Sequence, residues 1–537
     1  MPNESGLDLN DLEAMERILQ LRLDTARREA VRTQLQRHLT SAQTVRDAGI
    51  LTGVPPASIF SPLTPDAPVP PAGPATGAGS LVGETTPVTR LEDVPSATLR
   101  QLAVSFREGH LTSLSVTEYL LAHIAKHDGS LQAIVTPLTK RALSAARRAD
   151  EAFAEGVDLG PLQGIPYLAK DLLAVPEAPT TWGISRHEHR VLDGTAAVVE
   201  RLDQAGAVLL AKVSMGELAM GDVWFGGTTK NPWDLSEGSS GSSAGSAAGL
   251  AAGYAPLAIG SETMGSILSP SARCGVVGLR PTFGRVSRFG AMPLSWSLDK
   301  IGPMTRSAAD AALAFSVLAA KDPRDPVSRE APFPWPPQGS VRDAALKLRV
   351  GVPRNLLENP PESLHAFLNA FRTLGGDAKA IDDLPSVSLE SMMTLLMVEA
   401  SSQFDDMVRD GSLDGLVSQD ENAWPTHLRA AQYVSGVDYL QAQRMQRHIR
   451  DALTTLFGSV DVLVTPSTDG SAMLAGNGAG FPALSLPVGR GPEGRPLGSV
   501  ALLGRADFEH EPLLLGVAIE ELEGPLVLPP AFRDSAS

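Results

Sequence analysis

The sequence predicts an α/β protein with a mixed or mostly parallel sheet. Short apolar, β-branched segments at 206–213, 346–353 and 461–466 fit buried strands. Helical patterns lie between such segments, and the one at 195–206 ends at a glycine directly before the first of them. Strands that alternate with helices are typical of the α/β class. At about 100–200 residues per domain, 537 residues allow two to four domains, or one large domain with an appendage.

The remaining body elements follow from local signals. Residues 96–109 and 113–128 are expected to form helices, each with a serine at its start as the cap. The proline-rich stretch 322–340 is expected to be an exposed connection.

The N-terminal region differs in pattern from the body. Apolar side chains recur every three or four residues over 9–39, which predicts one amphipathic helix, and a weaker helical stretch covers 41–49. The segment 61–80 is rich in proline and glycine and is typical of a linker. We therefore expect a helical element at 1–60, a linker at 61–92 and a catalytic body at 93–537. The apolar stripe must be buried, whether by packing, by forming a homodimer or by covering a substrate entrance.

Composition and charge exclude several classes of protein. Apolar residues make up 43% and charged residues 20%, as in globular proteins, and the net charge of −16 disfavours contact with nucleic acid. The single cysteine, Cys274, excludes an intramolecular disulfide framework. The N-terminus lacks the apolar stretch of a secretory signal, and no apolar stretch has the length of a membrane span. We expect a cytoplasmic protein without a membrane span, metal or cofactor.

The segment 238–282 has the most unusual composition. It is dense in Gly, Ser and Ala but also contains apolar residues that need a core, such as Leu257, Ile259 and Val277. Glycine-rich turns inside buried structure direct backbone amides at a ligand, or allow helix and sheet to pack closely. Both interpretations remain open from composition alone.

The motifs of this segment resemble those of the amidase signature family of serine hydrolases. The residues that carry the resemblance are GSSGSSAGSAAG (238–249), ETMGSI (262–267), CGVVGLRPT (274–282) and, upstream, GIPYLAKD (164–171). Further similar segments follow in the expected order, so that the likeness spans about 95–520. It implies a mixed sheet covered by helices on both faces, with a small N-terminal helical extension added here.

The resemblance also implies a catalytic triad. Ser266 matches the nucleophile, Ser242 matches a bridging serine that follows a cis peptide bond, and Lys170 matches the general base. The backbone N–H groups of Thr263, Met264, Gly265 and Ser266 correspond to the oxyanion hole.

Elementary chemistry sets a condition on this triad. A serine hydroxyl is a weak nucleophile that needs a neighbouring base, and no histidine lies in the segment. A lysine serves as the base only when it is neutral, which requires its pKa to fall from about 10.4 to about 7. Burial supplies this shift, and Lys170 follows the apolar run 165–169, which predicts a buried strand.

Several positions depart from the family pattern. Glu262 stands in place of an aspartate and Met264 in place of a glycine. Many relatives have an arginine just after the nucleophile, where this chain has Leu268 and Ser269. Because a substrate carboxylate would lose that bidentate partner, we expect a neutral, partly hydrophobic substrate. The expected pocket residues are Met220, Trp224 and Leu268, beside Met264.

Three functions remain open from the sequence. The first is an amidohydrolase acting on a small-molecule amide, with esters and carbamates as related substrates. The second is the glutaminase (A) subunit of a tRNA-dependent amidotransferase. The third is a catalytically silent scaffold on the same fold, suggested by Met264 and Glu262.

Overall fold

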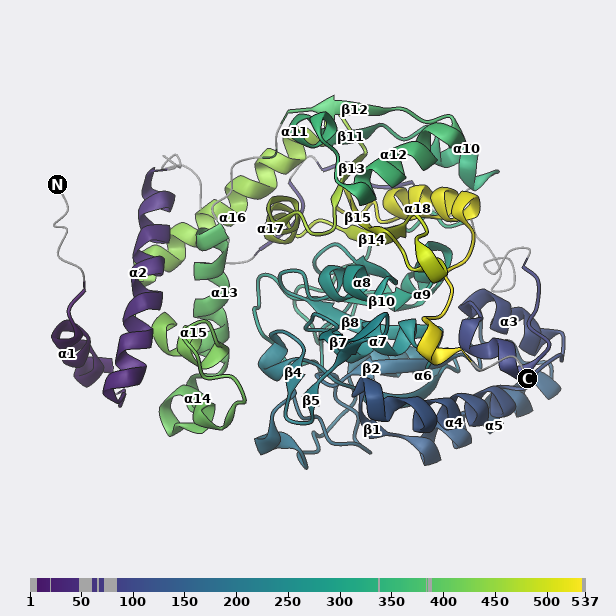
Figure 1. The fold of residues 1–537 in the computed structure, drawn as a ribbon, viewed down its shortest axis with the longest axis horizontal. Coiled ribbons are helices and arrows are strands. Elements are labelled where there is room, and N and C mark those ends of the chain that lie inside the picture. Colours follow the sequence, from purple (N-terminus) through teal and green to yellow (C-terminus); the bar gives the residue numbers. More distant parts are fainter. Residues whose placement is uncertain are drawn as a thin grey trace.

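The computed structural model describes residues 7–19, 21–47, 60–64, 67–71, 85–336, 339–382, 384 and 389–533. Within these residues, eleven strands form one sheet (Figure 1). From one edge to the other they are β1 (Ile134–Pro137), β3 (Val208–Val213), β2 (Pro166–Lys170), β8 (Leu257–Glu262), β10 (Lys300–Thr305), β9 (Val277–Arg280), β14 (Ala483–Val488), β15 (Gly498–Gly504), β13 (Val462–Pro466), β11 (Val350–Pro353) and β12 (Ala378–Ile381). Two small ribbons pair β4 (Val223–Trp224) with β5 (Gly227–Thr228), and β6 (Lys230–Asn231) with β7 (Asp234–Gly238).

The sheet is mixed, as predicted. Strands β3, β2 and β8 run parallel to one another, as do β13, β11 and β12, and the other neighbours are antiparallel. All residues of β3, β11 and β13 are buried, which explains their largely apolar sequences and confirms the strands expected at 206–213, 346–353 and 461–466, although β11 begins only at Val350. The buried strand expected at 165–169 is β2. The parallel pairing of β2 with β8 places the carboxyl ends of both strands at the same edge of the sheet.

Helices flank both faces of this sheet (Figure 1). The helices of the region that contains the sheet are α3 (Leu99–Arg107), α4 (Ser113–Leu131), α5 (Thr139–Ala154), α6 (Ala197–Gln204), α7 (Ala244–Ala251), α8 (Leu268–Cys274), α9 (Ala308–Leu318), α10 (Val341–Ala345), α11 (Arg354–Glu358), α12 (Glu362–Leu374), α17 (Gly470–Ala479) and α18 (His510–Glu523). A separate helical layer contains α1 (Leu9–Leu19), α2 (Thr25–Asp47), α13 (Leu389–Gln403), α14 (Asp405–Asp410), α15 (Trp424–Ala431) and α16 (Gly436–Leu456). Short 3-10 turns are η2 (Leu91–Ser96), η3 (Ser185–His187), η4 (Glu217–Ala219), η5 (Ser412–Gly415), η6 (Pro492–Gly494) and η7 (Pro530–Phe532).

The two helices expected near the start of the body are present as α3 and α4. Their caps are threonines and not the expected serines. Thr98 accepts from the backbone of Gln101, whose side chain accepts in return from Thr98, and Thr112 forms the same reciprocal pair with Ser115.

The N-terminal region folds as two helices, so the expectation of one helix over 9–39 is wrong. Helix α1 ends at Leu19, and α2 begins at Thr25 and continues through most of the expected second stretch. The side chain of Asp24 accepts a hydrogen bond from the N–H of Arg27 at 2.8 Å, which caps the start of α2. Residues 48–59, and with them the end of the expected helical element, lie outside the described residues.

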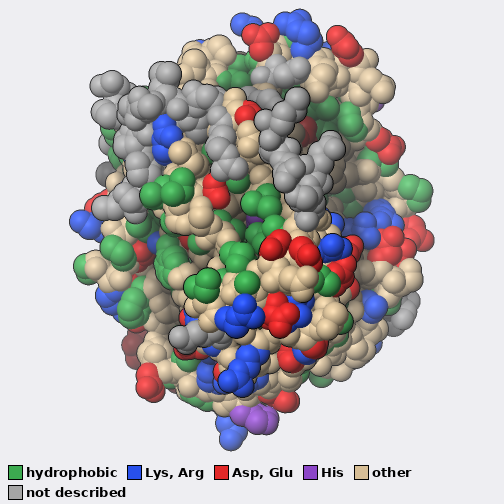
Figure 2. All heavy atoms as spheres, turned by 90° about the vertical axis from the view of Figure 1, so that its left-hand side faces the viewer, with side chains coloured by type: hydrophobic (Ala, Val, Ile, Leu, Met, Phe, Trp, Pro, Cys, Tyr) green, Lys and Arg blue, Asp and Glu red, His purple; other side chains and the backbone are tan. Residues whose placement is uncertain are grey.

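The apolar side of α2 is buried within the chain. Val31 and Leu35 are buried in the common core, and α2 contacts α13 and α15. Ser41 Oγ lies 3.1 Å from Thr394 Oγ1 on α13, and Gln34 Nε2 donates to the carbonyl of Glu421. Of the three roles considered for this stripe, the structure shows packing. Figure 2, which turns this helical layer toward the viewer, shows apolar side chains interspersed with charged ones on its outer face.

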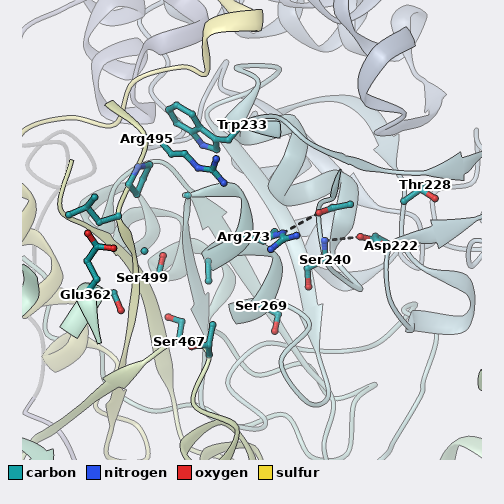
Figure 3. A pocket seen from close by; sticks show the side chains of 18 residues that line it. Asp222, Thr228, Trp233, Ser240, Ser269, Arg273, Glu362, Ser467, Arg495 and Ser499 are labelled. Atoms are coloured by element: carbon teal, nitrogen blue, oxygen red, sulfur yellow. Dashed lines mark hydrogen bonds between the residues drawn. The ribbon is translucent and has the colours of Figure 1, made fainter. Parts of the chain in front are cut away.

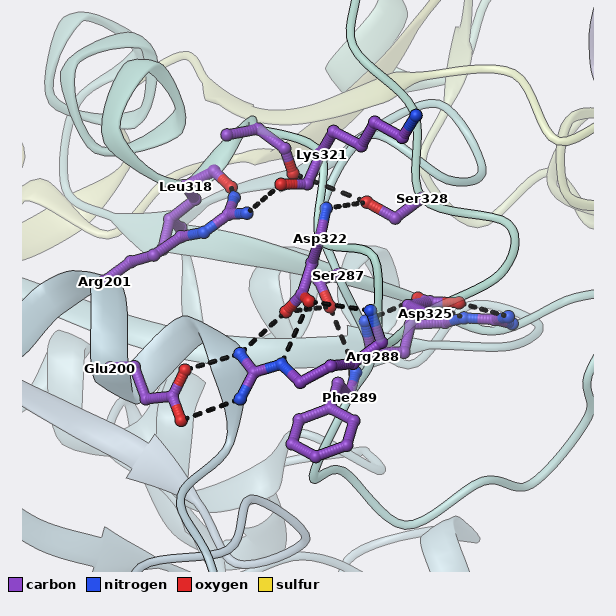
Figure 4. A network of polar contacts seen from close by, with 12 residues as sticks. Glu200, Arg201, Ser287, Arg288, Phe289, Leu318, Lys321, Asp322, Asp325 and Ser328 are labelled. Atoms are coloured by element: carbon purple, nitrogen blue, oxygen red, sulfur yellow. Dashed lines mark hydrogen bonds and ion pairs between the residues drawn. The ribbon is translucent and has the colours of Figure 1, made fainter.

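The connection at 322–340 is more buried than expected. Asp322 and Asp325 are buried because they accept hydrogen bonds from Ser287, Arg288 and Arg324 (Figure 4). These contacts hold the first part of the connection against the body.

Helices of sufficient length and apolarity to cross a membrane do not occur in the described part of the chain.

Candidate active site

The strand ends bring three serines to one lysine. Lys170 is the last residue of β2, Ser261 lies near the end of the neighbouring β8, and Ser242 and Ser243 directly precede α7. Lys170 Nζ lies 2.8 Å from Ser242 Oγ, 3.1 Å from Ser243 Oγ and 2.9 Å from Ser261 Oγ. The structure therefore joins two of the three residues of the expected triad directly.

The environment of Lys170 meets the chemical condition for a base. Its side chain is fully buried, and this burial lowers the pKa of the amine from 10.5 to about 7, although the charges of Asp299 and Glu262 oppose the shift. The adjacent Asp171 does not neutralise it, because its carboxylate pairs with Lys212 at 2.7 Å. Among the described residues, the hydrogen-bond partners of the Lys170 amine are three hydroxyl groups and one carbonyl.

The segment before α7 is held in a compact turn. The Gly241–Ser242 peptide bond is cis, as the motif predicts. A Cβ atom at Gly241 would lie 1.8 Å from the carbonyl oxygen of Gly221, so only glycine fits there. The N–H of Ser243 donates to the carbonyl of Ser266 at 3.1 Å, which places the backbone of Ser266 beside the two serines. Among the described residues, the hydroxyl of Ser266 has no hydrogen bond.

Glu262 organises the loop that carries Ser266. One carboxylate oxygen accepts the N–H groups of Ile267 and Leu268 at 2.8 and 2.9 Å, and the other accepts from Arg280 at 2.9 Å and from Asn477 at 2.8 Å. Burial opposes the ionisation of this carboxyl, but Arg280, Lys300 and the backbone donors outweigh it and lower its pKa. Although Glu262 replaces the aspartate of the family pattern, its carboxylate forms an ion pair with Arg280 and holds the loop by two hydrogen bonds.

Residues 263–266 form the turn between Glu262 and the start of α8, and their backbone N–H groups are the feature of interest. Gly265 has a φ of +95°, which favours glycine, and Thr263 Oγ1 donates to Asp299 at 2.6 Å. In the part of the chain that the structure describes, the N–H groups of residues 263–266 donate no hydrogen bond to the protein. Met264 is partly buried against the core. Such a run of free N–H groups is suited to a negatively charged oxygen.

None of the three expected pocket residues, Met220, Trp224 and Leu268, lines either of the two cavities beside the serine segments. Leu268 is buried, because Glu262 holds the start of α8 inward, whereas Met220 is 42% exposed. Trp224 is buried with its ring 4.9 Å from that of Phe225. The two cavities beside the serine segments are lined by other residues.

The first cavity, here called the serine groove, has a volume of about 870 Å³ (Figure 3). Its wall includes Ser240, two residues before Ser242, and Ser269, three residues after Ser266. Ser240 is fixed by its N–H, which donates to Asp222 at 2.8 Å. Across the groove lie Glu362, Ser467, Thr468, Arg495 and Ser499. The groove is thus polar and runs beside both serine segments.

The second cavity, here called the lysine cavity, has a volume of about 240 Å³. Its lining includes Thr263 and Ser261, and the Ser261 hydroxyl is a hydrogen-bond partner of Lys170. Sequence reasoning missed Ser261, Asp299 and Lys300, which line this cavity. The pairing of β10 with β8 brings Asp299 and Lys300 to the site, and no local motif signals that contact.

A known protein family matches more than half of this chain. The family described as Amidase matches residues 115–480. The chain belongs to the amidase signature family. A second family, described as the AtzG-like subunit of 1-carboxybiuret hydrolase, matches residues 12–60 of this amidase signature protein, where α1 and α2 lie.

Similar curated proteins are named as the A-type subunit of glutamyl-tRNA(Gln) amidotransferase. The protein from Thioalkalivibrio sulfidiphilus is 33% identical over 78% of this chain and 96% of its own length. The protein from Anaeromyxobacter dehalogenans is 34% identical over 80% of this chain and 97% of its own length.

Solved amidase signature structures share the fold. The peptide amidase of Stenotrophomonas maltophilia superposes with a TM-score of 0.69 at 29% identity, over 82% of this chain and 99% of that chain. A structure described as a vestigial protein complex that reveals the evolutionary origins of an s-triazine catabolic enzyme has a TM-score of 0.73 at 29% identity, over 80% of this chain and 100% of that chain.

Proposed function

We propose that this protein hydrolyses a carboxylic amide through a seryl acyl-enzyme, with Ser266, Ser242 and Lys170 as the triad. The contact of 2.8 Å between the buried Lys170 amine and the Ser242 hydroxyl carries the proposal. A lysine with a pKa of about 7 is neutral in about half of the molecules at pH 7, and can accept a proton there.

The reaction has two halves. Ser266 Oγ forms a bond to the substrate carbonyl carbon while its proton passes through Ser242 to Lys170. The C–N bond then breaks, and the proton returns to the leaving nitrogen. Water attacks the acyl-enzyme by the same relay, which releases the carboxylic acid and restores the Ser266 hydroxyl.

The backbone amides of Thr263, Met264, Gly265 and Ser266 would stabilise the intermediate. They are unoccupied within the described residues, and donors fixed in advance lower the barrier most effectively. The ion pair of Glu262 with Arg280 holds the end of this loop in place.

The acyl group is proposed to be neutral and partly hydrophobic, because Leu268 and Ser269 replace the arginine found in relatives. Leu268 is buried in the core, so Ser269 is the one of the two that lines the serine groove, where the acyl group would bind. Esters and carbamates pass through the same acyl-enzyme.

A serine-directed fluorophosphonate tests the nucleophile. We expect it to label the wild type and not Ser266→Ala, and we expect hydrolysis of N-propylbutanamide to disappear in the same variant. Ser243→Ala and Ser269→Ala are comparison variants, because both serines lie near the site. Labelling that persists in Ser266→Ala would overturn the assignment.

A second candidate is the glutaminase component of a tRNA-dependent amidotransferase, which the names of the similar curated proteins favour. In that case a partner protein and tRNA would join the complex. Release of ammonia from glutamine, together with copurification of partner proteins, would support this candidate over the stand-alone amidase. A silent scaffold would neither react with the fluorophosphonate nor hydrolyse any amide.

A further inference from the structure

The lysine cavity has both polar and apolar lining residues. Ser261 and Thr263, which lie next to the proposed catalytic segments, are among the polar ones. Leu172 and Met292 contribute apolar side chains to the lining, and Trp296, which is 47% exposed, lies at the surface. A volume of about 240 Å³ suits a small organic group of a few carbon atoms.

Lys300 also lines this cavity and has an unusual state. Its side chain is 2% exposed, and Nζ has no hydrogen-bond partner among the described residues. The two nearest carboxylates are occupied. Glu262 is bound by Arg280, Asn477 and two backbone N–H groups. Asp299 accepts from Thr263 and from the N–H groups of Leu294 and Ser295.

The other cations of the cavity have partners. Arg288 binds Asp325, and Arg324 binds Glu200 and Asp322 (Figure 4). Within the described residues, Lys300 is therefore the cation of this cavity whose charged group has neither a hydrogen bond nor an ion pair. Burial, with the charges of Arg280 and Arg288, lowers its pKa to about 7 against the opposing effect of Glu262 and Asp299. A bound anion would reverse this cost and restore the ammonium.

We propose that the lysine cavity binds a carboxylate at Lys300, and that this carboxylate belongs to the amine portion of the substrate. The assignment to the amine portion rests on the proposed function. The leaving nitrogen must receive its proton from the relay of Lys170, and Ser261 is shared by Lys170 and the cavity. The expectation of a neutral, partly hydrophobic group then concerns only the acyl portion of the substrate, which would lie toward the serine groove.

Matched amides test whether the carboxylate belongs to the amine portion of the substrate. N-butanoyl-β-alanine carries a carboxylate on the amine side, N-propylbutanamide is its neutral counterpart, and N-propylsuccinamic acid carries the carboxylate on the acyl side. We expect kcat/KM of the wild type to favour the first over the other two by at least about tenfold, since a charge-assisted hydrogen bond is formed with the first alone. Lys300→Met and Lys300→Gln should abolish this ratio, whereas the exposed Lys321→Met should leave it unchanged. An unchanged ratio in both Lys300 variants would overturn the substrate assignment.

Binding of propionate tests the site independently of turnover. Near pH 8 most Lys300 side chains are neutral, so binding should take up close to one proton, which calorimetry in buffers of different ionisation enthalpy measures. We expect this uptake in the wild type and in Lys321→Met, and its loss in both Lys300 variants. Lys300-dependent propionate binding without a preference among substrates would identify a free carboxylate as the occupant. Binding without any amide hydrolysis would refute the proposed function alone, and absence of binding would refute the site.

Discussion

Replacing Lys170 by methionine tests the central role of a neutral amine. A shift of the pKa from 10.5 to about 7 corresponds to about 5 kcal/mol of disfavoured charge, at 1.36 kcal/mol per unit. An ordinary lysine would be neutral in only about one molecule in 3000 at pH 7. We expect kcat/KM of the wild type for N-propylbutanamide to fall below about pH 7 as Lys170 becomes protonated. Lys170→Met should lower kcat/KM by about 10²- to 10⁴-fold.

The same substitution has a second effect, on stability. The folded pKa of Lys170 lies below the unfolded value, so between about pH 7 and 10.5 the unfolded chain binds more protons and the wild type gains stability as pH rises. Below about pH 7 Lys170 is charged in both the folded and the unfolded chain, so burial of the charge lowers the free energy of unfolding by its full amount. Above about pH 10.5 the amine is neutral in both states, and this effect is absent. Lys170→Met removes this cost, so its melting temperature should change less with pH than that of the wild type.

The assay combines amine release with thermal melting from pH 6 to 10. Lys321→Met is the matched exposed control and should retain the activity and melting profile of the wild type. Lys300→Met removes the other buried lysine with a pKa of about 7 and should flatten the melting profile in the same way. The reasoning fails if Lys170→Met keeps more than about a tenth of kcat/KM, or if its activity still falls below pH 7.

Three further predictions concern the supports of the site. Glu262→Gln should lower the free energy of unfolding by about 3–5 kcal/mol in chemical denaturation, since it leaves the buried Arg280 without its counter-charge; a loss below about 1 kcal/mol would contradict this. Gly265→Ala should lower kcat, because its Cβ would lie 2.5 Å from Met473 Sδ at a φ of +95°, and Met473→Ala in the same chain should restore part of the activity. Val31→Asp should lower the free energy of unfolding by about 3 kcal/mol through an unpaired charge under α2, and an unchanged melting temperature would refute that packing.

The parts of the fold that follow from local sequence were predictable. Continuous apolar segments such as 461–466 become buried strands because both of their faces are covered. The contact of Lys170 with Ser242 followed from long motifs in a fixed order, and the structure shows it directly. The break between α1 and α2 was missed because the apolar spacing continues through it over 9–39, whereas the side chain of Asp24 caps the second helix.

The surroundings of the site were less predictable, because they depend on contacts between distant segments. Leu268 was expected in a pocket, but the bonds of Glu262 to the start of α8 turn it inward. Lys300 had no local signal, since its place is set by the antiparallel pairing of β10 with β8. A pattern of residue types therefore indicates the reacting groups better than it indicates the walls around them.

The attachment of α2 to α13 has a consequence for how the protein behaves on dilution. Because both helices belong to one polypeptide, their association is a first-order event whose extent does not depend on protein concentration. The ratio of the N-terminal helices to the rest of the protein is fixed at synthesis, so neither assay concentration nor unequal expression can separate α2 from its partners α13 and α15.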